Sequence, residues 1–228
     1  SSGTEANHHK GVQYIKGNAK DINQLIRIKP DVIFHLGEYS RVENSFKDHK
    51  VVWENNSISI FPVVEFCKKM DSKLVYSGSS TLFSLKDEPD SSNPYAWSKK
   101  VNVDYLNSYA KWFGLNYAIS YFYNVYGKNE VGEGNYATVL GIFRERFHKN
   151  QKLPVVKPGT QKRNFTHIDD IISGLLIIGQ KGKGDGYGIG AAESYSILEL
   201  VNMIGSEIEF LPNRKGNRNS GILQTNKT

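Results

Sequence analysis

Apolar stretches with the length of β-strands alternate along this chain with longer stretches that carry apolar residues at helical spacing. Strands and helices that alternate in this way form a parallel sheet with helices on both faces. The sequence therefore predicts an α/β fold built on a doubly wound parallel sheet. The predicted strands lie at residues 12–17, 31–37, 73–80 and 116–127, and the predicted helices lie at 20–28, 47–70 and 94–113.

The pattern becomes less regular after Gly127, which predicts a small C-terminal lobe beside the sheet. We expect residues 1–127 and about 160–182 to form the sheet domain, and residues 128–159 and 183–228 to form the lobe. The expected elements are a helix at about 136–148, a strand at 153–157, a helix at 169–180, a flexible glycine-rich segment at 182–190, and a helix at 196–204 capped by Ser194 or Ser196.

Composition limits the functions that need considering. The net charge of +6 favours an anionic ligand, but the basic residues are scattered and form no nucleic-acid motif, so we expect a small phosphorylated ligand and no nucleic acid. No apolar run is long enough to cross a bilayer and nothing near Ser1 resembles a signal peptide, so we expect no membrane contact and a cytoplasmic location. The single cysteine, Cys67, excludes an internal disulfide and a cysteine-based metal cluster, and no metal is expected.

Three residues form a candidate proton-transfer group. Tyr95 and Lys99 are four residues apart in a predicted helix, so their side chains share one face, and Ser79 ends a predicted strand in the hydroxyl-rich segment "SGSS". A nearby ammonium stabilises a phenolate, and a neighbouring hydroxyl can share the substrate proton. Together they can remove a proton from an alcohol or sugar hydroxyl while hydride leaves the adjacent carbon. The spacing of Tyr95 and Lys99 taken alone is equally consistent with chance.

Six motifs in sequence order supply the context that the spacing lacks. They are "DVIFHLG", "NN", "VYSGSS", "PYAWSK", "YFYNVYG" and "QKRNFTHIDDI". In this order they resemble the extended short-chain dehydrogenase/reductases, specifically the nucleotide-sugar epimerase and dehydratase group that includes UDP-glucose 4-epimerases. The resemblance implies a Rossmann-like domain, bound NAD and a UDP-sugar substrate. It also implies that Tyr95 is the acid/base, that Lys99 binds the nicotinamide ribose and makes the phenol more acidic, and that Ser79 binds the reacting hydroxyl.

The same resemblance implies further binding residues. Phe122 matches a residue beside the nicotinamide, Asn124 matches one beside the substrate diphosphate, and Arg163 and Arg214 match arginines that hold that diphosphate. A polar helix-surface role for Asn55, or a solvated surface role for either arginine, stays open. The implied cofactor-binding residues are Asn18, Ala19, Leu36, Gly37, Asn55, Ser77, Tyr95, Lys99 and Phe122; the implied substrate-binding residues are Ser79, Ser80, Asn124, Arg163, Arg214 and Gly221.

The resemblance also bears on the reaction. Its 4,6-dehydratases carry an acidic pair where this chain has Ser80 and Thr81, so epimerisation is favoured, with C4 of a UDP-hexose or UDP-N-acetylhexosamine as the expected position. Tyr95 would take the hydroxyl proton, NAD would take and return hydride, and the keto-sugar would turn over between the two transfers. Gly221 would leave room for an N-acetyl group. A non-catalytic nucleotide-sugar-binding remnant, a reductase, or an epimerase acting at another carbon stay as alternatives.

Several features depart from the pattern of the group. The chain has no "GxxGxxG" motif, so we expect the first strand, glycine-rich turn and helix to be missing and the chain to be truncated at both ends. Glu38 stands where alanine or glycine is usual, and its carboxylate is expected to repel the cofactor phosphates. Asn18 replaces an aspartate that usually meets the adenine. Members of the group pair through the helices at 47–70 and 94–113, which implies a homodimer.

Overall fold

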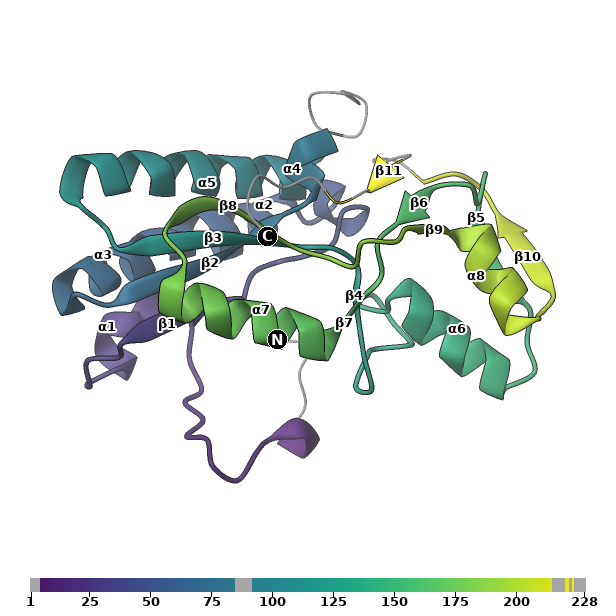
Figure 1. The fold of residues 1–228 in the computed structure, drawn as a ribbon, viewed down its shortest axis with the longest axis horizontal. Helices are drawn as coiled ribbons and strands as arrows, with labels where there is room; N and C mark the ends of the chain where they lie inside the picture. The colour runs from purple at the N-terminus through teal and green to yellow at the C-terminus, as the bar shows by residue number, and fades with distance from the viewer. Residues whose placement is uncertain (1–4, 85–91, 215–219, 222, 224–228) are drawn as a thin grey trace.

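The computed structural model describes residues 5–84, 92–214, 220–221 and 223. Its main sheet is parallel and has the strand order β1-β2-β3-β8 (Figure 1). This arrangement confirms the predicted α/β fold with a parallel sheet. The strands are β1 (Val32–His35), β2 (Lys73–Ser79), β3 (Tyr117–Phe122) and β8 (Gly184–Ile189).

Helices cover both faces of this sheet because successive side chains on a strand point to opposite sides. On β2, Leu74 and Tyr76 pack into one apolar cluster with α3 (Ser59–Met70) and α5 (Pro94–Phe113). Val75, between them, packs instead with α7 (Ile168–Lys181). Figure 1 shows α5 and α7 on opposite sides of the sheet, which makes it doubly wound as predicted.

Helix α5 begins and ends at the residues expected from the sequence. Its N-cap, Asn93, accepts a hydrogen bond from the Ala96 amide at 2.9 Å, and Pro94 occupies the first turn, where its missing N–H costs nothing. Gly114 ends the helix in a left-handed conformation with φ of 71°. These caps fix the first two turns, which carry Tyr95 and Lys99, against the carboxyl end of β2.

A smaller lobe has an apolar core of its own, formed by Phe143, Leu153, Val155, Ile197 and Val201. It lies beyond the carboxyl ends of the main strands (Figure 1). Its elements are α6 (Val139–His148), β5 (Leu153–Val156), α8 (Ile197–Ile204) and β10 (Ile208–Leu211), with β5 paired to β10. Short strands join the two parts: β4 (Val125–Tyr126) with β7 (Thr166–His167), and β6 (Lys162–Arg163) with β9 (Tyr195–Ser196) and β11 (Ser220–Gly221).

Two segments differ from the prediction. Residues 12–17 form no strand; Val12, Tyr14 and Ile15 are about half exposed, and the segment pairs with no other strand among the described residues. The segment 182–190 was expected to be flexible and to lie in the lobe. It contains β8, which pairs with β3 in the main sheet, and Tyr187 and Ile189 supply the apolar contacts that fix it.

The predicted helix at 47–70 is divided into α2 (His49–Val52), a π-helical stretch η4 (Trp53–Ile58) and α3. A π-helical stretch changes which side chains face the core, and such stretches are frequent at functional sites. Here the change buries Asn56 and exposes Asn55. The remaining short elements are η1 (Glu5–Asn7), η2 (Ala19–Asp21), α1 (Ile22–Leu25), η3 (Asn44–Phe46) and α4 (Thr81–Ser84).

Candidate functional site

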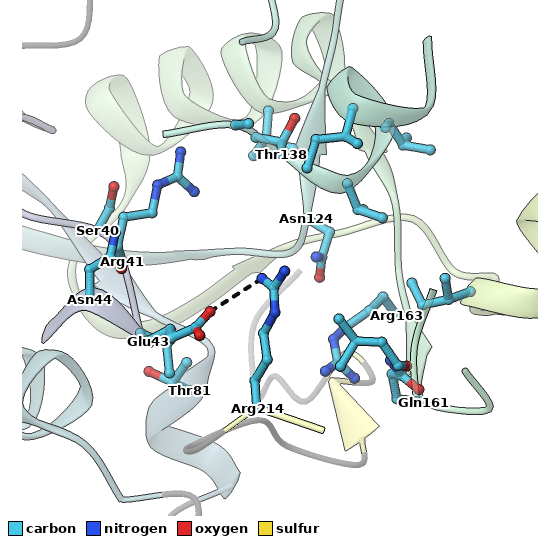
Figure 2. Close-up of a pocket in the computed structure, with 18 of the residues that line it drawn as sticks. Ser40, Arg41, Glu43, Asn44, Thr81, Asn124, Thr138, Gln161, Arg163 and Arg214 are labelled. Atoms are coloured by element: carbon cyan, nitrogen blue, oxygen red, sulfur yellow. Dashed lines mark hydrogen bonds and ion pairs between the residues drawn. The ribbon is translucent and has the colours of Figure 1, made fainter. Parts of the chain in front are cut away.

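A pocket of about 680 Å³ lies between the carboxyl ends of the main strands and the smaller lobe. Ligands of open α/β sheets bind at this edge. The pocket brings together seven of the residues predicted from the sequence, and Figure 2 shows three of them, Asn124, Arg163 and Arg214. The seven residues are Ser79, Ser80, Tyr95, Phe122, Asn124, Arg163 and Arg214.

Ser79 and Tyr95 both line the pocket. Ser79 ends β2, and its Oγ lies 2.8 Å from Thr81 Oγ1 and 3.3 Å from the Thr81 amide nitrogen, which donates to it. Tyr95 lies in the first turn of α5. The structure therefore places a hydroxyl pair and a phenol at the same end of the sheet.

Lys99 is buried and is not one of the lining residues of the pocket. Two short contacts fix its ammonium group. Its ammonium donates to the Ser77 carbonyl oxygen at 2.6 Å and lies 2.5 Å from Glu38 Oε2. It also lies over the ring of Tyr76, 4.8 Å from the ring centroid. The two side chains of the ion pair are 4% and 2% exposed, so the positive charge of Lys99 is balanced at short range by Glu38.

Glu38 corrects one expectation. Its carboxylate was expected to face the cofactor phosphates as a free negative charge, but it is buried and turned toward Lys99. It also accepts hydrogen bonds from the Tyr76 hydroxyl at 3.0 Å and from Asn102 Nδ2 at 3.3 Å, and His35 Nε2 lies 3.3 Å from it. This pairing was not predicted, because Glu38 and Lys99 are far apart along the chain; helical spacing alone would put Asn102 near Lys99 on α5.

The charges of this buried group shift two pKa values. Burial by itself would raise the pKa of Glu38, but the Lys99 ammonium and the His35 ring outweigh burial and hold the pKa of that carboxyl below its ordinary value of 4.5. Burial and then the Glu38 charge raise the pKa of Tyr76 well above its usual value. Glu38 is therefore a carboxylate and Tyr76 a neutral phenol at neutral pH.

The asparagine side chain that is buried next to the Glu38 and Lys99 pair is Asn56, whereas the residue predicted from the sequence to support the cofactor is Asn55. Asn55 is exposed, and its described contact is a backbone one: its carbonyl oxygen accepts from the Ser59 hydroxyl. Asn56 is fully buried; its Oδ1 accepts from the Tyr39 amide at 2.7 Å, and its Nδ2 donates to the Ser98 hydroxyl at 3.0 Å. The π-helical stretch reverses the two positions, and neither spacing nor composition reveals such a stretch.

Matched substitutions at these two asparagines should differ in stability. Asn56→Ala leaves the buried Tyr39 amide without its acceptor, and we expect it to lower the free energy of unfolding by about 1–3 kcal/mol. Asn55→Ala should change it by less than about 0.5 kcal/mol, as for an ordinary surface substitution. Urea unfolding of both variants measures the difference. An equal loss of free energy of unfolding in the two variants would contradict the finding that Asn56 is buried and Asn55 is exposed.

The substrate-side residues lie as follows. Arg163 is buried on β6 and donates from Nη1 to the Lys162 carbonyl oxygen at 2.8 Å. Arg214 extends into the pocket, where its Nη1 lies 3.3 Å from Glu43 Oε2 (Figure 2). Asn124 has a φ of 34° after β3. Gly221 is buried on β11 opposite Arg163 of β6, so it adjoins the pocket wall without being one of the lining residues.

Of the residues expected to bind the cofactor, Leu36 and Gly37 directly follow the carboxyl end of β1 and are exposed. Leu36 is 46% exposed at the end of β1, and a Cβ added at Gly37 would meet no atom within 4 Å. Ser77 donates to the His35 carbonyl oxygen at 3.2 Å. Asn18 caps η2, where it accepts from the Lys20 amide, and Ala19 packs against the core.

The described residues contain neither a membrane-spanning helix nor a cluster of metal ligands. No helix in this part of the chain is both long enough and apolar enough to span a membrane. The same residues hold no group of three or more His, Cys, Asp and Glu side chains arranged to bind a metal ion.

Comparison with known proteins identifies the family. The model of the NAD-dependent epimerase/dehydratase family matches residues 1–190, which is most of the chain. The chain belongs to this family. NAD is the cofactor of the NAD-dependent epimerase/dehydratase family, and the Rossmann-like sheet, Ser79 and Tyr95 all lie within the matched residues.

Both kinds of enzyme in the family's name occur among the relatives. A putative UDP-glucose 4-epimerase of Methanocaldococcus jannaschii is 27% identical over 223 residues, which cover 92% of this chain and 72% of the relative. A dTDP-D-glucose 4,6-dehydratase of Dictyostelium discoideum is 29% identical over 217 residues, which cover 84% of this chain and only 49% of the relative. This chain therefore spans between half and three quarters of these relatives.

Solved structures match the fold closely. The UDP-glucose 4-epimerase of Thermotoga maritima, solved with UDP-glucose, aligns with a TM-score of 0.89 at 22% identity. The alignment covers 99% of this chain and 80% of that one. At this identity the match establishes the fold of the epimerase/dehydratase family and nothing finer.

Proposed function

We propose that the protein takes part in NAD-dependent epimerisation of a nucleotide sugar, at C4 of a UDP-hexose or UDP-N-acetylhexosamine. One observation carries the proposal: Ser79 and Tyr95 share a pocket with Arg163 and Arg214. A guanidinium binds phosphate oxygens in a bidentate manner. A nucleotide sugar whose diphosphate meets the arginines can thus reach the phenol with its sugar.

Each residue has a separate role in this proposal. Tyr95 removes the proton from the sugar hydroxyl and later returns it, and Ser79 orients that hydroxyl. Ser80 and Asn124 contact the sugar and the diphosphate from the ends of β2 and β3. Lys99 does not line the pocket; it is held by Glu38 and by the Ser77 carbonyl oxygen, and its charge acts on the Tyr95 phenol.

The open edge of the sheet is suited to the nicotinamide half of NAD. Gly37 leaves space for close approach of a ligand, and Leu36 offers an exposed apolar surface. The Lys99 ammonium has three N–H groups, and its described contacts with Glu38 and Ser77 account for two, so one can bind the ribose. When bound, NAD supplies reversible acceptance of hydride. The remaining proposed cofactor contacts are Asn18, Ala19, Asn55, Ser77 and Phe122.

Epimerisation is proposed over dehydration because of Ser80 and Thr81. Elimination needs an acid and a base beside the sugar, and these two positions carry hydroxyls instead of carboxylates. A second candidate is a nucleotide-sugar-binding protein without catalysis. The balanced charge of Lys99 favours that candidate, because a neutralised ammonium stabilises a phenolate less.

The two candidates are separated by one pair of measurements. Purified protein is analysed for bound NAD by absorbance and mass spectrometry, and is then incubated with UDP-glucose and with UDP-N-acetylglucosamine. We expect bound NAD and conversion to the 4-epimers. Binding of the UDP-sugar without conversion would select the binding protein, and conversion to a 4-keto-6-deoxy sugar would select a dehydratase.

Two finer proposals follow from positions outside the pocket lining. Gly221, opposite Arg163, leaves room for an N-acetyl group, so turnover of UDP-N-acetylglucosamine should at least equal that of UDP-glucose. We also propose a homodimer through α3 and α5, which expose Phe61, Trp97 and Trp112. Sedimentation analysis would refute the dimer by finding a monomer at micromolar concentration.

A further inference from the structure

Arg41 is a pocket residue that none of the roles above uses. It follows β1 and lines the same pocket as Ser79 and Tyr95. Figure 2 shows it on the opposite side of the pocket from Arg163, with Asn124 and Arg214 between them.

The guanidinium of Arg41 is only partly satisfied. Its Nη2 donates to the Tyr136 carbonyl oxygen, and its Cζ lies 5.4 Å from the centroid of the Tyr136 ring. Its Nε is buried and has no hydrogen-bond partner among the described residues. An unpaired buried donor costs about 1–3 kcal/mol, and more for a charged group, so a ligand that accepts from it recovers that cost.

The charge of Arg41 is also unbalanced. The two pocket carboxylates belong to Glu43 and Glu130, and within the described residues neither forms an ion pair with it. Glu43 is paired with Arg214 instead, and Glu130 accepts from the Thr138 hydroxyl. A partly buried cation without a counter-ion favours an anionic ligand.

Arg41 lies close to the reacting end of the pocket. Burial lowers the pKa of Arg41, and the phenols of Tyr136, Tyr95 and Tyr39 act in the opposite direction, so Tyr95 is within electrostatic reach of the guanidinium. In a hexose whose C4 hydroxyl meets Tyr95, the nearest exocyclic carbon is C6, attached to C5. A carboxylate at C6 is the acidic group that a hexose can carry nearest to this reacting carbon, two bonds away from it.

We propose that Arg41 determines substrate specificity by binding a carboxylate at C6, so that the preferred sugar is a UDP-hexuronate. The carboxylate accepts from Arg41 Nε and balances the guanidinium charge. A neutral C6 hydroxymethyl group can accept one hydrogen bond but leaves the charge unbalanced. This inference rests on the proposed function, because it needs Tyr95 at the reacting carbon.

Calorimetric titration in the presence of NAD tests the inference with three probes: UDP-glucuronate, UDP-glucose and UDP. The proteins are the unaltered chain, Arg41→Met, which keeps the length and removes the charge, and Arg27→Met, which removes the charge of an exposed arginine remote from the pocket lining. We expect the unaltered chain and Arg27→Met to bind UDP-glucuronate about tenfold or more tightly than UDP-glucose. Arg41→Met should lose that preference and bind UDP as before.

The other outcomes would overturn the inference in distinguishable ways. Equal affinity of the unaltered chain for UDP-glucuronate and UDP-glucose would refute the carboxylate preference and leave the proposed function intact. Weaker binding of UDP itself by Arg41→Met would show that Arg41 holds the diphosphate instead. Failure of the unaltered chain to bind any of the three probes would refute the inference and the proposed function together.

Discussion

Replacement of Tyr95 by phenylalanine is expected to lower turnover of the UDP-sugar by about 10²–10⁴-fold, the usual contribution of a general acid/base. The ring stays in the first turn of α5 and only the proton-transferring hydroxyl is lost. Binding of the UDP-sugar, measured by calorimetry, should therefore change little. This separation of turnover from binding is what distinguishes a group that acts in the transition state from one that only holds the substrate.

A second tyrosine on the same helix provides the matched control. The hydroxyl of Tyr105 is buried and has no hydrogen-bond partner among the described residues, so Tyr105→Phe removes the same atom without breaking a described contact. We expect its turnover to stay within about twofold of the unaltered protein, as for a substitution with little effect on folding. If Tyr95→Phe turned over substrate as fast as Tyr105→Phe, the acid/base assignment would be wrong.

Removal of the Glu38 charge is expected to destabilise the fold strongly. Glu38→Gln keeps the size of the side chain but leaves the Lys99 ammonium buried without its counter-ion, 2.5 Å from an amide. Breaking a buried pair in this way costs about 3–5 kcal/mol in the free energy of unfolding. Urea unfolding at neutral pH measures the loss, and Glu38→Gln combined with Lys99→Met should recover part of it because no uncompensated charge remains.

An exposed ion pair offers the control for Glu38. Lys50 and Glu54 lie 4.0 Å apart with side chains 83% and 53% exposed, so Glu54→Gln should cost less than about 1 kcal/mol. Equal losses for Glu38→Gln and Glu54→Gln would show that the buried pair does not form in solution.

The contribution of the Glu38 carboxylate to stability depends on pH in a defined direction. Because the folded-state pKa of Glu38 lies below its ordinary value of 4.5, its stabilising contribution is complete above that pH and is lost as the pH falls through the lower folded-state pKa. The difference in free energy of unfolding between the unaltered protein and Glu38→Gln should therefore become smaller only below pH 4.5.

The helices and strands of the main sheet were predictable where the apolar spacing in the sequence matches the face that each element buries. Helix α5 matches its predicted range, since Asn93, Pro94 and Gly114 mark its ends in the sequence itself. Strand β8 was missed because its glycines read as a flexible segment, while the apolar contacts of Tyr187 and Ile189 that order it come from α7, distant in the sequence. Tertiary contacts decide such segments, and local composition does not contain them.

In the candidate site, too, some features were predictable from local motifs and others depend on tertiary contacts. The structure brings four of the predicted site residues to one pocket: Ser79, Tyr95, Arg163 and Arg214. Glu38 was recognised as unusual but was given the wrong partner, because a short loop after β1 can turn its side chain toward either face. The burial of Asn56 and the exposure of Asn55 were not predictable, because the π-helical stretch shifts the helical register by one residue.

The contact between Arg214 and Glu43 has a consequence for how ligands compete. The two side chains are about half exposed, so they attract each other only weakly, and an entering anion displaces the carboxylate at little cost. A phosphate with two oxygens in the plane of the guanidinium binds it better than this single 3.3 Å contact does, whereas an uncharged sugar gains nothing by the exchange. Glu43 thus holds Arg214 in the pocket lining, and a phosphorylated ligand displaces the Glu43 carboxylate more readily than an uncharged one.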